Sequence, residues 1–192
     1  VVFQVIVGTL IGATAGFYGG KVDNVLMRIN DVFAAIPNLL MAITIATALG
    51  HSIINMIIAI GISGTPALAR IVRATVMTVK NQEFVEAGRA LGGNDKQIII
   101  FHLIPNCIAP IIVQGTLRIA AAILATSSLS FLGIGIKPPT PEWGNMLSAG
   151  REFLRNAPHI TVIPGIFIII TILSINLMGD GLRDALDPKL KR

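Results

Sequence analysis

Long apolar segments with few charges alternate along the chain with polar connections. Five of these segments are long enough to cross the roughly 30 Å hydrocarbon core of a bilayer as helices, which satisfy their own backbone hydrogen bonds. The pattern therefore predicts an all-α fold, a polytopic membrane helix bundle with about five transmembrane helices. The segments are residues 1–18, 32–49, 53–71, 104–124 and 159–178.

The connections differ in length and charge. They comprise residues 19–31, a tight turn at 50–52, a polar loop at 72–103, a proline-rich stretch at 125–158 and a charged tail. Lysine and arginine collect on the cytoplasmic side of membrane proteins, so we expect the loop 72–103 and the C-terminus in the cytoplasm and the proline-rich stretch outside. The residues that carry this bias are Lys21, Arg28, Arg70, Arg73, Lys80, Arg89, Lys96, Arg183, Lys189, Lys191 and Arg192 on one side, against Lys137, Arg151 and Arg155 on the other.

The beginning of the chain lies within an apolar segment. Five crossings that end in the cytoplasm place Val1 outside. If the native N-terminus is cytoplasmic, an odd number of further crossings must precede Val1. We therefore expect at least one additional membrane helix upstream, and we interpret the chain as N-terminally truncated.

Composition agrees with a membrane protein and excludes several other classes. The 192 residues are 53% hydrophobic and 13% charged, whereas about 25% charge is usual in soluble domains. The net charge of +5 is not gathered into basic clusters with aromatic residues, so no nucleic-acid partner is expected. Cys107 has no second thiol, and His51, His102 and His159 lie far apart without nearby ligands. We expect no metal site, no cofactor and no catalytic centre.

Several residues within the apolar segments stand out. Gly8, Gly12 and Gly16 recur every fourth residue, with Gly20 next in the series, and predict a helix face that another helix approaches closely. Arg118 lies inside the fourth crossing, where a lipid-facing cation is costly. It is therefore a candidate for lining a pathway through the bundle, or for pairing with a carbonyl oxygen or with an acid of a partner subunit. Candidate bends in the second and third crossings are Pro37, Gly61, Gly64 and Pro66.

The polar loop contains two short amphipathic helices in the segment NQEFVEAGRALGGNDKQIIIFHLIPN, residues 81–106. Asn81 is the expected cap of the first helix, and Gly92 with Gly93 is expected to end it. Asn94 and Gln97 form a capping-box pattern for the second. An apolar and small face is predicted from Phe84, Val85, Ala87, Gly88 and Leu91. This face either lies on the bilayer surface or docks into a groove of a partner, and its small residues favour docking.

Within this loop, Glu86-Ala87-Gly88, then Gly92, then Ile104-Pro105 resembles the cytoplasmic signature of binding-protein-dependent importer permeases, which usually begins Glu-Ala-Ala. Gly88 replaces the second alanine. The resemblance implies a type I ABC importer transmembrane domain over residues 1–192, with residues 72–103 as its coupling loop. It also implies that a coupling helix docks on an ATPase subunit through Glu86, Ala87, Gly88, Arg89, Ala90, Leu91 and Gly92.

Residues 130–147 and 179–188 resemble the second permease of dipeptide, oligopeptide and nickel importers. That resemblance implies a permease subunit of the cytoplasmic (inner) membrane that moves peptides by alternating access and is not itself an enzyme. Its implied partners are two ATPase subunits, a paralogous permease, an extracytoplasmic substrate-binding protein and membrane lipid. A nickel permease, and a channel or scaffold without an ATPase, remain alternatives. Pro138, Pro139 and Pro141 exclude regular helix in the external stretch, and Trp143 suits a membrane interface.

Overall fold

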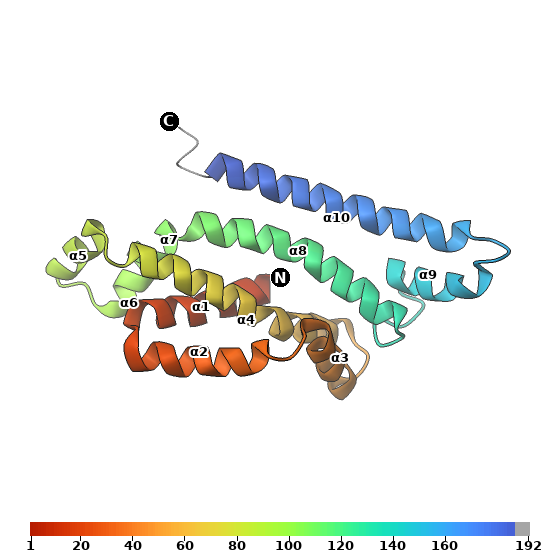
Figure 1. Ribbon diagram of the computed structural model, residues 1–192, viewed down its shortest axis with the longest axis horizontal. Helices are drawn as coiled ribbons and strands as arrows, with labels where there is room; N and C mark the ends of the chain where they lie inside the picture. Colours follow the sequence, from red (N-terminus) through yellow and green to blue (C-terminus); the bar gives the residue numbers. More distant parts are fainter. Residues whose placement is uncertain (187–192) are drawn as a thin grey trace. The chain divides into compact units, whose positions relative to one another are not determined.

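The computed structural model describes residues 1–186, and every regular element in that range is helical (Figure 1). Backbone contacts divide the chain into two compact units. The first unit consists mainly of Val2–Ala35 and Gly64–Gly115, and the second mainly of Ile36–Ser63 and Thr116–Asp180. The elements are α1 (Val2–Tyr18), α2 (Gly20–Ala34), α3 (Asn38–Leu49), α4 (Ile53–Val79), α5 (Glu83–Ala90), α6 (Asp95–Gln97), the π-helix η1 (Ile98–Leu103), α7 (Ile104–Asn106), α8 (Ile108–Phe131), α9 (Trp143–Gly150), the 3-10 helix η2 (Arg151–Phe153) and α10 (His159–Leu186).

Three of the described helices, α4, α8 and α10, are each long and apolar enough to cross a membrane. Helices α2 and α3 meet the same test only as a pair that is bent by 83°. Helix α1 has 17 residues, which is the lower limit for a spanning helix of about 17–25 residues. The polytopic, all-helical fold expected from the apolar pattern is thereby confirmed.

The predicted second crossing, residues 32–49, is not one helix. Helix α2 ends at Ala34 and α3 begins after Pro37, which is the N-cap of α3. Proline has no amide hydrogen to donate and keeps the preceding residue out of the helical region, so the chain bends there. Residues 19–31, which we expected to be a connection, form most of α2. Their charges are typical of loops, but here they lie on an amphipathic helix.

Three other predicted crossings extend further than the apolar pattern indicated. Helix α4 continues to Val79, α8 to Phe131 and α10 to Leu186, because each passes from an apolar segment into an amphipathic one without a break. Helix α4 also runs through the candidate bends at Gly61, Gly64 and Pro66 unbroken. The last residues of the predicted charged tail, 187–192, lie outside the described residues.

In the first unit, α1 packs against α4 along the face that carries Gly8, Gly12 and Gly16. A Cβ at Gly8 would lie 3.1 Å from the side chain of Leu68, and a Cβ at Gly16 would lie 2.9 Å from the carbonyl oxygen of Arg73. At Gly12 the corresponding position is filled by the carbonyl oxygen of Ala69. Gly20 does not continue this face, because nothing lies within 4 Å of its Cβ position. Only a helix without side chains on this face fits so close to α4.

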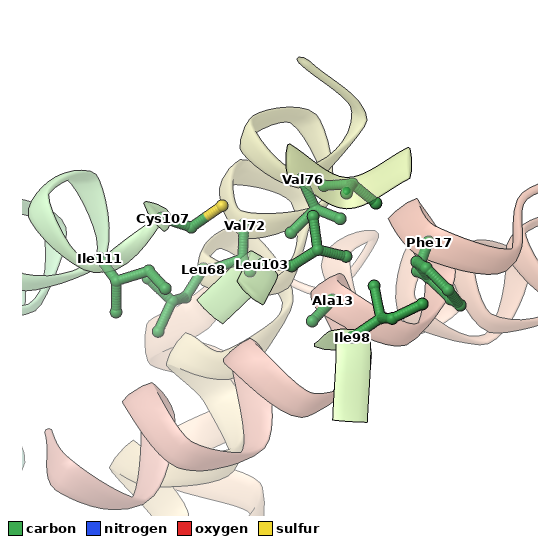
Figure 2. Packing of buried hydrophobic residues seen from close by; sticks show 10 residues of the cluster. Ala13, Phe17, Leu68, Val72, Val76, Ile98, Leu103, Cys107 and Ile111 are labelled. Carbon is green, nitrogen blue, oxygen red and sulfur yellow. The ribbon is translucent and has the colours of Figure 1, made fainter. Parts of the chain in front are cut away.

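The core of the first unit joins the loop to these helices. Val85 of α5 and Ile98 and Leu103 of η1 are buried in one hydrophobic cluster with residues of α1 and α4. Because η1 is a π-helix, whose hydrogen bonds join residues five apart, Ile98 and Leu103 both face the cluster. The buried members of this cluster, which we call the joint cluster, are Ala13, Phe17, Leu68, Val72, Val76, Val85, Ile98, Leu103, Cys107 and Ile111 (Figure 2).

The second unit has its own smaller core, formed by Ala42 of α3, Met56 and Ile60 of α4, and Leu129 of α8. Helix α10 lies beside α8 (Figure 1), and a Cβ at Gly179 would lie 3.3 Å from the side chain of Leu117. Most of the large apolar side chains of α10 are exposed. In a membrane such side chains meet lipid or another subunit.

Candidate functional site

Helix α5 begins at Glu83 with Gln82 as its N-cap, and the side chain of Gln82 makes no capping hydrogen bond. The prediction that Asn81 caps this helix is therefore wrong by one position. Glu83 and Glu86 lie in the first turn, and Arg89 lies in the last. The acidic residues at the start and the basic residue at the end interact favourably with the helix dipole. Each such charge stabilises a helix by about 0.3–1 kcal/mol.

The end of α5 is a Schellman motif, as the glycine pair predicts. Gly92 has a φ of 83°, and its amide donates to the carbonyl oxygen of Arg89 at 2.9 Å. The amide of Gly93 donates to the carbonyl oxygen of Gly88 at 3.1 Å. This pair of bonds, with a left-handed glycine between them, satisfies the last carbonyls of the helix.

The capping box predicted for the next helix is also present. The amide of Gln97 donates to Oδ1 of Asn94 at 2.9 Å, and the amide of Asn94 donates to Oε1 of Gln97 at 3.0 Å. Two helix-end amides are thereby satisfied. The stretch between the two helices is thus fixed on both sides by hydrogen bonds.

The predicted apolar and small face of α5 does not face one way. Val85 and Gly88 are buried against the rest of the first unit. Phe84 is half-buried, and Ala87 is exposed. Leu91 is 89% exposed. Gly88 therefore serves internal packing rather than the free face, because a Cβ there would lie 3.3 Å from the ring of His102. The free face consists of Glu86, Ala87, Ala90, Leu91 and Gly92, which are all exposed. Arg89 is exposed as well, but its guanidinium turns toward α1.

A groove of about 440 Å³ lies between α5 and η1. Its apolar rim is formed by Leu91 and by Phe101, which is 69% exposed. His102 and Gly88 lie on its inner side. Two large apolar side chains exposed beside a groove are typical of a surface that a partner protein covers. The remaining lining residues are Phe84, Ala87, Gly93 and Gln97.

The opposite flank of α5 is attached to the ends of α1 and α4. The guanidinium of Arg89 lies 5.1 Å from the ring centroid of Phe17 on α1, a cation–π arrangement. Lys80, which follows α4, donates from Nζ to the carbonyl oxygen of Gly16 at 2.9 Å. A polar cavity of about 440 Å³ lies at this junction, lined by Phe17, Tyr18, Lys80, Asn81, Val85, Glu86, Arg89 and Asp95.

Sequence reasoning missed Phe101, His102 and the second role of Gly93. A Cβ at Gly93 would lie 2.8 Å from the carbonyl oxygen of Gly88, so this glycine is needed for space as well as for ending the helix. Phe101 and His102 lie within η1. A sequence reading that assumes the α-helical period of 3.6 residues assigns these two residues to other sides of the helix than the π-helix does. No signal in the sequence marks that π-helix.

The two other predicted features lie in the second unit. Arg118 is half-buried near the middle of α8, 15 residues after the end of the loop 72–103. The proline-rich stretch contains no helix between Phe131 and Trp143, as its prolines predict. Trp143 stacks on Phe167 of α10 with centroids 6.1 Å apart. A mainly apolar cavity of about 460 Å³ lies between α8 and this stretch, lined by Ile119, Ala122, Ile123, Thr126, Ser127, Pro141, Glu142, Trp143 and Met146.

The chain is similar to known membrane transport proteins in both sequence and fold. Residues 8–192 match the model of the family described as the binding-protein-dependent transport system inner membrane component. The di/tripeptide transport system permease protein DppC of Pseudomonas aeruginosa is 47% identical over 191 residues, which are 100% of this chain and 63% of that protein. The glutathione transport system permease protein GsiD of Escherichia coli O157:H7 is 48% identical over 194 residues, with 99% and 64% covered.

The chain thus spans just under two thirds of the length of these curated relatives. Among solved structures, a chain of the MetNI methionine ABC transporter in an inward-facing conformation superimposes with a TM-score of 0.74 at 17% identity. The match covers 97% of this chain and 88% of that one. At this level of identity, the likeness concerns the fold.

Proposed function

Because the chain belongs to the family of binding-protein-dependent transport system inner membrane components, we propose that it is a permease subunit of an ATP-driven importer and forms part of a membrane pathway for small peptides. The names of relatives at 47–48% identity, a di/tripeptide and a glutathione permease, support peptides as the cargo. The lack of an evident catalytic centre in the sequence leaves ATP hydrolysis to partner subunits.

The observation that carries the proposal is the two-faced character of α5. Its free face exposes Glu86, Ala87 and Leu91, while Val85 on the other face is buried in the joint cluster with α1 and α4. A force applied to the free face is therefore passed to two helices of the bundle through close-packed side chains, which transmit displacement because protein interiors compress little. These are the properties that a coupling helix requires.

In the proposed cycle, the free face docks on an ATPase subunit, and a paralogous permease completes the pathway. ATP-driven closure of the ATPases moves α5, and the joint cluster rocks α1 and α4 with it. The pathway between the two permeases then opens outward and accepts a peptide from an extracytoplasmic binding protein. Hydrolysis resets the bundle, so that the protein alternates between two packed states.

The proposal includes an orientation. The loop 72–103 and the C-terminus lie in the cytoplasm, which puts the proline-rich stretch with Trp143 outside. The distribution of lysine and arginine supports this orientation. It places α5 on the side of the membrane where ATP is available.

Cysteine crosslinking tests the coupling role. The full-length protein, with Cys107→Ala and Ala87→Cys, is co-expressed with the ATPase subunits of its system and treated in membranes with a short bifunctional thiol reagent. Ala87 is exposed on the free face, so we expect a crosslink to an ATPase cysteine whose yield changes when ATP is added.

Asn156→Cys in the same background is the matched control, because Asn156 is exposed on the opposite side of the proposed topology. It should give no crosslink to an ATPase. If Ala87→Cys gives none either, while the protein is folded in the membrane, the coupling role is wrong and a channel or scaffold without an ATPase becomes the better interpretation.

A further inference from the structure

Arg118 lies near the middle of α8, one of the three helices long enough to span a membrane. A guanidinium at that depth keeps its charge, because arginine does not lose its proton in proteins. It is costly in contact with lipid, and arginines at this depth almost always face the interior of a bundle or a watery cavity. The surroundings of Arg118 decide which of these applies.

The register of α8 places Arg118 on a packed face. Ile111 precedes it by seven residues, close to two helical turns, and is buried. Leu129, eleven residues further along and close to three turns, is buried as well. Ala122 and Ala125 on the same side pack against the core of the second unit. The face that carries Arg118 is therefore the one that α8 turns toward protein.

The guanidinium of Arg118 has no carboxylate partner among residues 1–186. The two arginines on α4 differ in this respect, since Arg73 pairs with Asp23 and Arg70 pairs with Asp31. One turn beyond Arg118, Ala122 has a small side chain and lines the mainly apolar cavity of the second unit, whereas Gly115, one turn before it, packs close to Val5. Arg118 is thus a half-buried, unpaired cation on a protein-facing surface inside the membrane.

We propose that Arg118 binds the carboxylate of the transported peptide. This inference rests on the proposed function and adds a binding residue to it. Every unmodified linear peptide carries a C-terminal carboxylate, and a guanidinium binds a carboxylate through two parallel hydrogen bonds. A group common to all peptides suits a pathway that accepts many sequences. Binding through this group does not depend on the side chains of the transported peptide.

The test uses the complete importer, with the full-length permease, its paralogous permease, the ATPases and the binding protein in proteoliposomes. Initial rates of ATP-dependent uptake are measured for radiolabelled trialanine and for trialanine amide, which lacks the carboxylate. The binding protein is the same in every sample. Any change in the ratio of the two rates between variants therefore reports on the permease.

We expect Arg118→Gln to lower the preference for trialanine over its amide by about tenfold, the effect of losing about 1.4 kcal/mol of binding. Arg118→Lys, which keeps the charge, should retain most of the preference. Arg70→Gln is the matched control. It removes one positive charge from an exposed, paired position and should leave the ratio unchanged.

Three results would overturn the proposal for Arg118. One is an unchanged ratio in Arg118→Gln, and another is an equal loss of uptake of both probes, which indicates a structural role. The third is failure of Arg118→Gln to assemble with the paralogous permease, which assigns the guanidinium to an acid of that subunit. If the unmodified importer takes up neither probe, the proposed function itself is contradicted, and the role of Arg118 with it.

Discussion

Arg73 on α4 holds Asp23 on α2 by two hydrogen bonds, in which Nε and Nη2 each donate to a different carboxylate oxygen at 2.5 Å. Bidentate pairs of this kind combine charge with fixed geometry. The two side chains are 29% and 11% exposed, so solvent screens the pair only partly. The pair therefore fixes α2 against α4 in the first unit.

We expect Asp23→Asn to lower the free energy of unfolding by about 2 kcal/mol, because hydrogen bonds to charged groups contribute about 1.5–3 kcal/mol. Thermal unfolding of the detergent-solubilised protein measures the loss. The double variant Asp23→Asn, Arg73→Gln should lose less than the sum of the single variants, because each single variant leaves an unpaired charge and the double variant leaves none.

Asp31→Asn is the control for this pair, since Asp31 and Arg70 are 51% and 58% exposed. An exposed pair contributes less than about 1 kcal/mol. Equal losses of unfolding free energy in Asp23→Asn and Asp31→Asn would show that the partly buried pair stabilises the fold no more than the exposed pair does.

Gly12→Ala should separate α1 from α4. The added methyl group would meet the carbonyl oxygen of Ala69 and lie 2.8 Å from Cβ of Val72, and neither atom can move without moving the helix. Overpacking of this kind costs about 1–3 kcal/mol. Gly181→Ala in α10 is the matched control, because no atom lies within 4 Å of its Cβ position, and alanine stabilises a helix by up to about 1 kcal/mol relative to glycine. A similar melting temperature for the two variants would contradict the close packing.

Gly92→Ala should loosen the end of α5 for a conformational reason alone. The φ of Gly92 is 83°, and nothing lies within 4 Å of its Cβ position. A left-handed conformation costs an alanine about 1–2 kcal/mol, whereas asparagine adopts it more readily. We expect faster hydrogen exchange of the α5 amides in Gly92→Ala and a smaller change in Gly92→Asn. Equal exchange in both variants would mean that the Schellman motif does not hold α5.

Leu91→Ser separates docking from folding, because Leu91 is 89% exposed and contributes little to the core. We expect unchanged thermal stability of the isolated permease and a reduced yield of ATPase subunits in co-purification. Leu132→Ser, at an apolar residue 54% exposed beyond the end of α8, should leave that yield unchanged. Retention of the ATPases in Leu91→Ser at the original yield would exclude this leucine from the docking surface.

The features predicted correctly are those that neighbouring residues determine. Gly92 ends α5 and the pair Asn94 and Gln97 caps the next helix, because each motif needs only a few consecutive residues. Pro37 likewise breaks a helix by its own chemistry. The family was recognisable because its signature is also a short segment. How the signature docks on a partner stays a prediction.

Features that depend on distant residues were not predictable in the same way. The pairing of Asp23 with Arg73 joins positions 50 residues apart, so the charges of α2 looked like those of a loop. The inward position of Gly88 depends on His102, and His102 is placed by a π-helix that shifts the periodicity. The length of α4 was underestimated because its last two turns carry polar residues that are compatible with a solvent-exposed end.

That extra length bears on how far the proposed coupling loop lies from the hydrocarbon. A straight helix of 27 residues is about 40 Å long at about 1.5 Å per residue, while the hydrocarbon layer is about 30 Å thick. If α4 crosses along the bilayer normal with Ile53 at the edge of the hydrocarbon, about 10 Å of it projects beyond the hydrocarbon before α5 begins. On that placement, we expect a protein that docks on α5 to make most of its contact beyond the hydrocarbon.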